Sequence, residues 1–232
     1  MHISIITLFP EMFSGAFDAS IVKRAKEKGK LHIHLVNLRK FASDTYGTVD
    51  DHPYGGGTGM VLRVDVIDRA LKHTRTLIKE GTPRVILMTP QGETYTQKKA
   101  RQLSTADHLI LLCGHYEGVD ERVRALVDEE ISIGDYVLTG GEIPAMVLTD
   151  SIARLLPDVL VKADATTNES FEQSMLEYPH YTRPEIYGDA RVPAVLLSGN
   201  HKNITKWRQE QALEKTRKRR PDLLLREKKD LA

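Results

Sequence analysis

The chain has 232 residues, of which 41% are hydrophobic and 28% charged, a composition typical of an ordinary globular protein of one or two domains. It contains no run of 18 apolar residues and no basic, apolar leader, so the sequence predicts neither a membrane-spanning helix nor a secretory signal peptide. The single cysteine, Cys113, excludes an internal disulfide and a Cys-x-x-Cys metal site, and it fits a reducing cytoplasm.

The net charge of +1 is distributed unevenly along the chain. Residues 201–232 contain 11 Lys and Arg against 5 Asp and Glu, whereas residues 1–200 contain 22 against 27. A basic segment after a slightly acidic body indicates an anionic partner for the C-terminal part of the chain.

The first two thirds of the chain alternate between predicted strands and predicted helices. Alternating or continuously apolar segments predict strands at 2–8, 31–37, 84–89, 108–113 and 130–133. Helical periodicity and capping signals predict helices at 21–28, 64–80, 96–103, 119–127 and 142–156. This alternation predicts an α/β domain whose mostly parallel sheet is covered by helices on both faces.

A polar segment without apolar periodicity, 161–174, follows this domain and is typical of a linker. Beyond it, 179–188 is rich in turn residues, and 200–218 and 221–230 are predicted helices. We therefore expect a large domain over 1–161, an interdomain linker over 162–174, and a small basic helical domain over 175–232.

Glycine-bearing turns follow three of the predicted strands. They lie at 89–92 (TPQG), 113–118 (CGHYEG) and 133–141 (IGDYVLTGG). Glycine lets a ligand lie directly against the backbone, and parallel strands end at one edge of a sheet, so these turns predict a ligand pocket lined by main-chain groups. The spacing matches neither Gly-x-Gly-x-x-Gly nor the phosphate-binding loop. An apolar lining with few charges suits an adenosine group better than a polyphosphate, although glycines are common at such turns in any α/β protein.

Several motifs in combination resemble the bacterial tRNA (guanine-N1)-methyltransferases, a family within the SPOUT class of knotted methyltransferases. They cover the chain from end to end and comprise IITLFPEMF (5–13), DDHPYGGGTGM (50–60), residues 113–122 and 132–144, PHYTRP (179–184), LLSGNH (196–201) and Trp207-Arg208.

The resemblance implies a homodimeric enzyme that binds S-adenosylmethionine in a deep C-terminal trefoil knot of the α/β domain. Such enzymes methylate N1 of the guanosine immediately 3′ of the anticodon in tRNA. By position, the cofactor-binding residues are Pro90, Gln91, Gly92, Gly114, Tyr116, Glu117, Gly118, Ile133, Gly134, Asp135, Tyr136, Val137, Leu138, Gly140, Gly141 and Pro144. A requirement for Mg²⁺ is possible but cannot be read from the sequence, and no metal-ligand set is predicted.

Guanine N1 carries a proton and is a weak nucleophile, so a general base must remove the proton while a cation stabilises the charge that develops on O6. In the family the base is an aspartate of the interdomain loop and the cation is an arginine after the knot. Arg154 matches the arginine, but this chain has Glu169 at the aspartate position. Glutamate is a competent base with one more methylene; Asp164 is the second candidate, and Glu169 could alternatively be a solvated charge.

The resemblance also implies substrate contacts. Asp50, Gly55 and Gly59 would lie near the flipped-out guanine, and His180 and Arg183 would contact tRNA. Without the resemblance, 50–60 is a surface loop whose paired carboxylates could bind Mg²⁺, and 180–183 is turn packing. The basic cluster 215–220 favours contact with the tRNA backbone, although such runs are often only solvated.

Two alternatives to this function remain open from the sequence. One is a knotted methyltransferase that acts on another RNA, such as ribosomal RNA. The other is a non-catalytic RNA-binding protein that keeps the fold, which the glutamate at position 169 permits.

Overall fold

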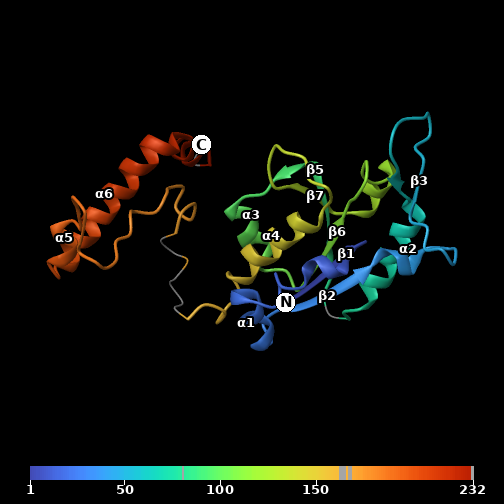
Figure 1. Ribbon diagram of the computed structural model, residues 1–232, viewed down its shortest axis with the longest axis horizontal. Coiled ribbons are helices and arrows are strands. Elements are labelled where there is room, and N and C mark those ends of the chain that lie inside the picture. The colour runs from blue at the N-terminus through green and yellow to red at the C-terminus, as the bar shows by residue number, and fades with distance from the viewer. Residues whose placement is uncertain (80, 162–165, 167–168, 231–232) are drawn as a thin grey trace. The chain divides into compact units, whose positions relative to one another are not determined.

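The computed structural model describes residues 1–79, 81–161, 166 and 169–230. The chain divides into two compact units, Met1–Lys162 and Ala163–Ala232, and each is described by itself (Figure 1). Six of the thirteen residues of the expected linker, 162–165 and 167–168, lie outside the described residues, and so does position 80, at the end of a predicted helix.

A five-stranded sheet forms the centre of the first unit. All strand pairs are parallel, in the order β2-β1-β6-β5-β7 (Figure 1). The strands are β1 (His2–Thr7), β2 (His32–Asn37), β5 (Arg84–Thr94), β6 (His108–Cys113) and β7 (Glu129–Ser132). Every residue of β6 is buried, as its continuous apolar sequence predicts for a strand covered on both faces. The predicted parallel sheet is therefore confirmed.

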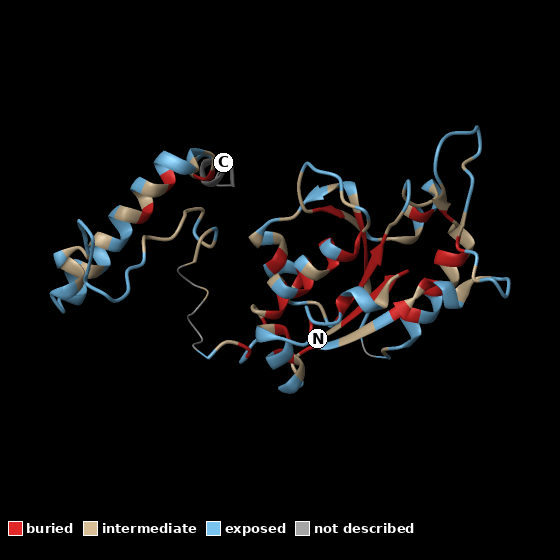
Figure 2. Ribbon diagram, in the orientation of Figure 1, coloured by how far each residue is buried: buried red, intermediate tan, exposed pale blue. Residues whose placement is uncertain are grey.

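Helices cover both faces of the sheet. The described helices are α1 (Ser20–Glu27), α2 (Val64–Thr76), α3 (Gln97–Leu103), α4 (Glu142–Ala153) and the 3₁₀ helix η3 (Glu121–Leu126). One core cluster joins α1, α3 and α4 to the sheet, and a second joins α2 and η3 to its other face. Figure 2 shows the buried residues concentrated in the strands and on the helix faces that pack against them. The predicted helical cover of both faces is confirmed.

The first unit also contains shorter elements. They are η1 (Pro10–Phe13), η2 (Leu38–Phe41), β3 (Asp50–Asp51) and β4 (Val61–Leu62). β3 and β4 pair antiparallel, which closes the glycine-rich loop between them. The two ends of the loop 52–60 therefore lie side by side.

Three predicted elements differ from the structure. Pro90-Gln91-Gly92 is not a turn: β5 continues to Thr94 with a bulge, because a second stretch of pairing with β7 follows the interruption. α2 ends at Thr76, where the Thr76 hydroxyl donates to the His73 carbonyl at 2.7 Å and no further apolar residue enters the core. The segment 119–127 forms only the 3₁₀ helix η3.

The second unit contains the predicted C-terminal helices. Its elements are β8 (Ile186–Tyr187), β9 (Ala190–Arg191), α5 (Ala194–Leu197), α6 (His201–Arg219) and α7 (Pro221–Asp230). Asn200 caps α6, because its side-chain oxygen accepts from the Asn203 amide at 3.2 Å. The buried Thr216 hydroxyl accepts from the Leu176 amide at 2.9 Å and so fixes the entering chain against α6. None of the helices described in either unit has the length and apolarity needed to cross a membrane.

Candidate functional site

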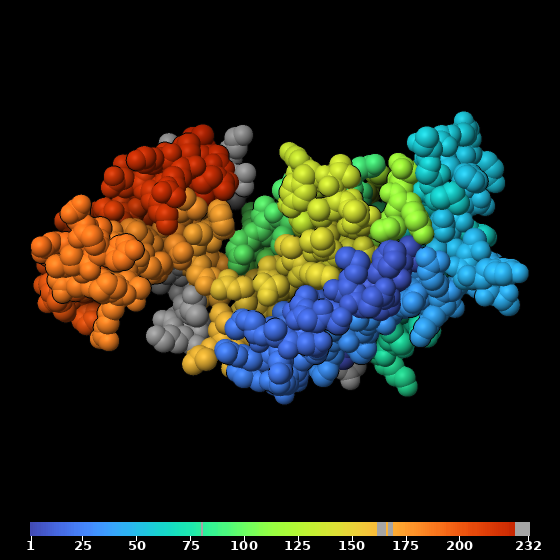
Figure 3. Space-filling view, viewed as in Figure 1, coloured from blue at the N-terminus to red at the C-terminus, as the bar shows by residue number. Residues whose placement is uncertain are grey.

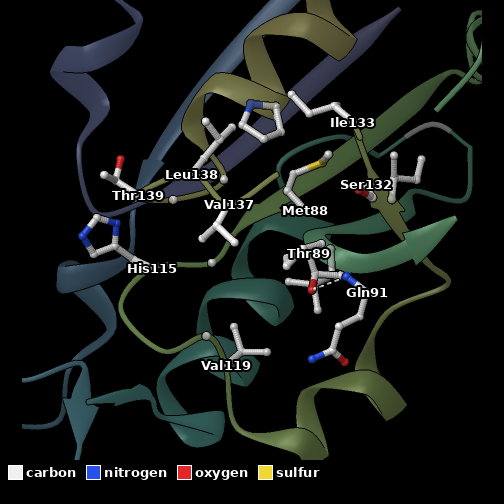
Figure 4. Close-up of a pocket in the computed structure, with 18 of the residues that line it drawn as sticks. Met88, Thr89, Gln91, His115, Val119, Ser132, Ile133, Val137, Leu138 and Thr139 are labelled. Atoms are coloured by element: carbon white, nitrogen blue, oxygen red, sulfur yellow. Dashed lines mark hydrogen bonds between the residues drawn. The ribbon is translucent and has the colours of Figure 1, made fainter. Parts of the chain in front are cut away.

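A cavity of about 290 Å³ lies at the carboxyl ends of β5, β6 and β7. Residues that follow neighbouring parallel strands meet at one edge of the sheet, which is where α/β proteins commonly bind ligands. The lining comes from 87–91, 114–119, 131–134 and 136–141, together with Glu121, Arg124 and Pro144. Figure 4 shows Gln91, His115, Val119 and Val137 arranged around the cavity.

Close backbone approach explains the glycines at 140 and 141. A Cβ atom on Gly141 would lie 2.7 Å from Cys113 Cα and 3.0 Å from Met88 Cβ. The Gly141 amide donates to the Gly114 carbonyl at 2.8 Å, and Gly140 forms an antiparallel bridge with His115. The chain returning from β7 therefore lies directly against the ends of β5 and β6 before α4 begins.

The cavity has few charges. Its described lining includes two carboxylates, Glu117 and Glu121, and one guanidinium, Arg124, beside apolar side chains such as Val119 and Leu138. This balance is unsuited to a polyphosphate, which needs several cations or a metal ion. It suits an apolar ring system that carries a positive group.

A buried carboxylate lies directly after the lining residues Gly140 and Gly141. Glu142, only 2% exposed, begins α4, where unpaired backbone amides favour a negative charge. Its Oε1 accepts from the Thr7 hydroxyl at 2.7 Å, and that hydroxyl accepts from the Phe9 amide at 2.9 Å. Burial, together with the nearby Glu142, raises the pKa of the Cys113 thiol well above its usual range, so Cys113 stays a protonated core residue.

Fourteen of the sixteen expected cofactor residues line this cavity. The other two do not: Asp135 is exposed, and Gly92 presses against the backbone of Glu130 and Ile131, where a Cβ atom would clash. The sequence interpretation missed further lining residues, namely Leu87, Met88, Thr89, His115, Val119, Glu121, Arg124, Ile131, Ser132 and Thr139. His115 and Thr139 lie inside the glycine-bearing segments and could have been included. Arg124 gave no such signal, because it lies outside the glycine-bearing segments and its contact with Gln91 joins residues 33 positions apart in the sequence.

The loop expected to approach the substrate packs beside the cavity. A Cβ atom on Gly59 would lie 2.5 Å from Glu117 Cγ, and the Glu117 amide donates to the Met60 carbonyl at 3.1 Å. Leu62 N donates to the Gly118 carbonyl at 3.0 Å. Asp50, in β3, pairs with Leu62, whereas Gly55 lies in the exposed tip. The base of the loop is thus fixed to the segment 117–118, which lines the cavity.

The expected catalytic residues belong to different units. Arg154 caps the carboxyl end of α4, where its amide donates to the Asp150 carbonyl at 3.3 Å. Glu169 belongs to the second unit, is half-buried there, and accepts from the Glu172 amide at 3.3 Å through its carbonyl. The second candidate base, Asp164, lies outside the described residues.

His180 and Arg183 line a separate hollow of the second unit. His180 Nε2 lies 3.5 Å from a Glu177 carboxylate oxygen, and its ring lies 4.8 Å from that of Tyr178. The Arg208 guanidinium sits over the Tyr178 ring at 4.7 Å. Neighbouring aromatic and cationic groups of this kind are suited to contacts with bases or phosphates.

No group of three or more His, Cys, Asp or Glu side chains in the described part of the chain is placed to hold a metal ion. The fold and the cavity together define an α/β protein with a cavity suited to a small, apolar-faced ligand at the carboxyl edge of a parallel sheet.

The chain belongs to the tRNA (guanine-1)-methyltransferase TrmD family, whose model matches residues 1–226. Three curated relatives are each named tRNA (guanine-N(1)-)-methyltransferase. The protein of Moorella thermoacetica is 53% identical over 227 residues, that of Syntrophomonas wolfei 54% over 226, and that of Anoxybacillus flavithermus 56% over 225. Each match covers 97% of this chain and 91% of the relative. The family resemblance identified from the motifs is therefore confirmed.

Proposed function

We propose that this enzyme transfers the methyl group of S-adenosylmethionine to N1 of the guanosine immediately 3′ of the anticodon in tRNA. The observation that carries the proposal is the backbone-lined cavity at the carboxyl ends of β5, β6 and β7, in a chain that belongs to this methyltransferase family. An electrophilic methyl on a sulfonium is the chemistry that the cofactor supplies when bound.

The described cavity fits this cofactor. Its apolar and main-chain walls can enclose an adenosine group, and its two carboxylates outnumber its one guanidinium, which favours a ligand that carries a sulfonium and an ammonium group. The fourteen lining residues that match the family motif are proposed as the cofactor site. Asp135 and Gly92 would act from outside it, on the loop and strand that form the walls.

A trefoil knot is proposed for the segment from β7 to α4. Support comes from the tight approach of Gly140 and Gly141 to the ends of β5 and β6, since a chain that returns between earlier segments needs residues without side chains at the crossing. The knot would hold together the three segments that follow β5, β6 and β7 and line the cavity.

The proposed chemistry uses two side chains. Glu169 would remove the proton from guanine N1 as the N1–methyl bond forms and the sulfonium–methyl bond breaks, with S-adenosylhomocysteine as the leaving group. Arg154 would stabilise the negative charge that develops on O6. Asp50, Gly55 and Gly59 would approach the extruded guanine, because their loop packs against Glu117 at the cavity.

The second unit is proposed as a tRNA-binding domain, joined to the catalytic domain over 1–161 by the linker 162–174. Support comes from the aromatic and cationic hollow that includes His180 and Arg183, and from the excess of basic residues in α6. A cytoplasmic location follows from the proposed substrate.

A homodimer is also proposed. Ile143 and Val147 on α4 are 43% and 40% exposed, one helical turn apart, and Met12 on the neighbouring η1 is 41% exposed. In Figure 3, α4 and the N-terminal segment lie side by side on one face. Apolar side chains left uncovered in this way are suited to a second copy of the chain.

A single-turnover methylation assay tests the function, with a tRNA transcript that carries guanosine 3′ of the anticodon and one that lacks it. We expect methylation of the first only; methylation of both would favour a different RNA target.

Glu169→Gln should lower the rate at least about a hundredfold, with unchanged binding of S-adenosylmethionine by calorimetry. Glu172→Gln, three residues further along, is the matched control, and a near-normal rate in Glu169→Gln would refute the base assignment.

A further inference from the structure

Arg124 connects three segments at one wall of the cofactor cavity. Its Nε lies 2.9 Å from a Glu121 carboxylate oxygen, and one terminal nitrogen donates to Glu130 Oε1 at 3.1 Å. The other terminal nitrogen donates to Gln91 Oε1. Glu121 lies on η3 with Arg124, Glu130 lies on β7, and Gln91 lies in the bulge of β5. One side chain therefore joins the elements that bound this wall.

This contact fixes the orientation of the Gln91 amide. A guanidinium has only donors, so the Gln91 oxygen must face Arg124, and the amide nitrogen with its two hydrogens is left to donate elsewhere. The Gln91 backbone is held as well, since its N–H donates to Thr89 Oγ1 at 3.4 Å (Figure 4). Gln91 and Arg124 both line the cavity. The wall thus presents a defined hydrogen-bond donor to a ligand.

The charges around Arg124 indicate what this donor meets. Two carboxylates, Glu121 and Glu130, contact the single guanidinium, so the group as a whole is slightly negative. Such a group does not attract the carboxylate of an amino acid. It suits an uncharged acceptor atom, such as a nitrogen of adenine or an oxygen of ribose.

We propose that Arg124 is a positioning residue for S-adenosylmethionine, which holds the Gln91 amide as a donor to a neutral acceptor in the nucleoside half of the cofactor. The inference rests on the proposed function and adds a determinant of cofactor affinity to it. Arg124 contacts no reacting atom in this scheme, so it sets cofactor binding and leaves the rate of methyl transfer at saturating cofactor unchanged.

The test compares Arg124→Met with Arg122→Met. Arg122 lies on the same 3₁₀ helix, pairs with Asp120 at 2.7 Å and does not line the cavity, so its replacement removes the same charge from the same element. We expect Arg124→Met to weaken S-adenosylmethionine binding about tenfold, the worth of one oriented hydrogen bond, and to raise KM for the cofactor with kcat unchanged. Arg122→Met should match the wild type in both.

Three further measurements separate positioning from a merely structural role. 5′-Methylthioadenosine, which lacks the amino-acid end, should lose affinity for Arg124→Met by the same factor, because the affected contact is to the nucleoside. Gln91→Ala and the double variant with Arg124→Met should bind equally weakly, since both remove one interaction. Arg124→Lys, which cannot reach three acceptors at once, should be intermediate and provides a folded alternative if Arg124→Met is unstable.

Any one of three results would overturn the inference. Equal cofactor affinity in wild type and Arg124→Met, additive losses with Gln91→Ala, or a fall in kcat without a rise in KM would each refute positioning through Gln91. If the wild type bound neither S-adenosylmethionine nor 5′-methylthioadenosine, the proposed function itself would fail, which is a separate outcome.

Discussion

Four histidines gather at the amino ends of three neighbouring strands, at the opposite end of the strands from the cavity. His2 stacks on His32 with ring centroids 4.7 Å apart, and its Nδ1 lies 3.2 Å from His34 Nε2. His108 is fully buried, and its Nε2 lies 2.9 Å from Ser4 Oγ. Burial, reinforced by the nearby His2 and His34, lowers the pKa of His108 to about 4. The fold therefore requires this imidazole to be neutral.

That requirement predicts an acid-sensitive stability. The unfolded chain binds a proton at His108 near the ordinary pKa of 6.5, whereas the folded chain does so only near 4. The free energy of unfolding is therefore unaffected by His108 above about pH 6.5. It decreases by on the order of 2–3 kcal/mol as the pH falls toward 4, because the unfolded chain then binds a proton that the folded chain does not. Urea unfolding at several pH values measures it. His108→Gln, which can still bond to Ser4, should flatten the decline, and an unchanged slope would exclude His108 as its source.

At the scale of the elements, the start of α4 is a tightly packed junction beside the cavity. Gly141 has an ordinary negative φ of −82°, so backbone freedom does not explain the glycine there. The lack of room for a side chain explains the glycine. A Cβ atom there would clash with the backbone of Cys113, and no side-chain rotation could relieve that clash.

Gly141→Ala should therefore destabilise the protein by about 1–3 kcal/mol and weaken S-adenosylmethionine binding, since α4 must shift away from β6. Gly114→Ala is the matched control for stability, because a Cβ atom there meets nothing closer than the Met88 carbonyl at 3.7 Å. Thermal unfolding followed by circular dichroism, with calorimetry of the cofactor, gives both quantities. Equal unfolding temperatures for the two variants would show that the junction can relax.

Local patterns predicted most of these elements but not their contacts. The continuously apolar 108–113 predicts a doubly covered strand, and Thr96 and Asn200 mark helix starts that the structure confirms. Pro90-Gln91-Gly92 reads as a turn in isolation, and only the pairing of Glu93 and Thr94 with β7 makes it a bulge. The proposed role of Arg124 depends on its contact with Gln91 on β5, 33 residues away in the sequence, so no local pattern could reveal it.

At the scale of the whole molecule, the proposed dimer can be tested directly. Ile143→Glu would place a charge on the exposed apolar face of α4, and we expect the dimer to dissociate in sedimentation experiments while the monomer stays folded. Leu35→Glu is the control, because Leu35 on β2 is 41% exposed, close to the 43% of Ile143. A wild-type chain that sediments as a monomer, or a dimer indifferent to Ile143→Glu, would contradict the proposed interface.

The basic cluster at the end of α6 divides into two kinds of residue. Lys215 donates to the Glu177 carbonyl at 3.0 Å, and Arg220 pairs with Asp222 at 2.7 Å and lies over the Phe171 ring. These two side chains make contacts within the second unit. Between them, 217–219 are exposed. The structure thus separates basic side chains that stabilise this unit from those that face solvent.

Replacing Arg217, Lys218 and Arg219 together with glutamine should weaken tRNA binding without changing the affinity for S-adenosylmethionine. Removing the neutralisation of one phosphate reduces the slope of log affinity against log salt by about 0.7–0.9, so a decrease of up to about 2–3 is expected. Filter binding over a range of salt concentrations measures that slope. Replacing Lys23, Arg24 and Lys28 removes the same charge from exposed positions at α1 and is the matched control. Because long-range attraction would respond to both triple variants alike, an equal loss of slope in the two would argue against direct phosphate contact by α6.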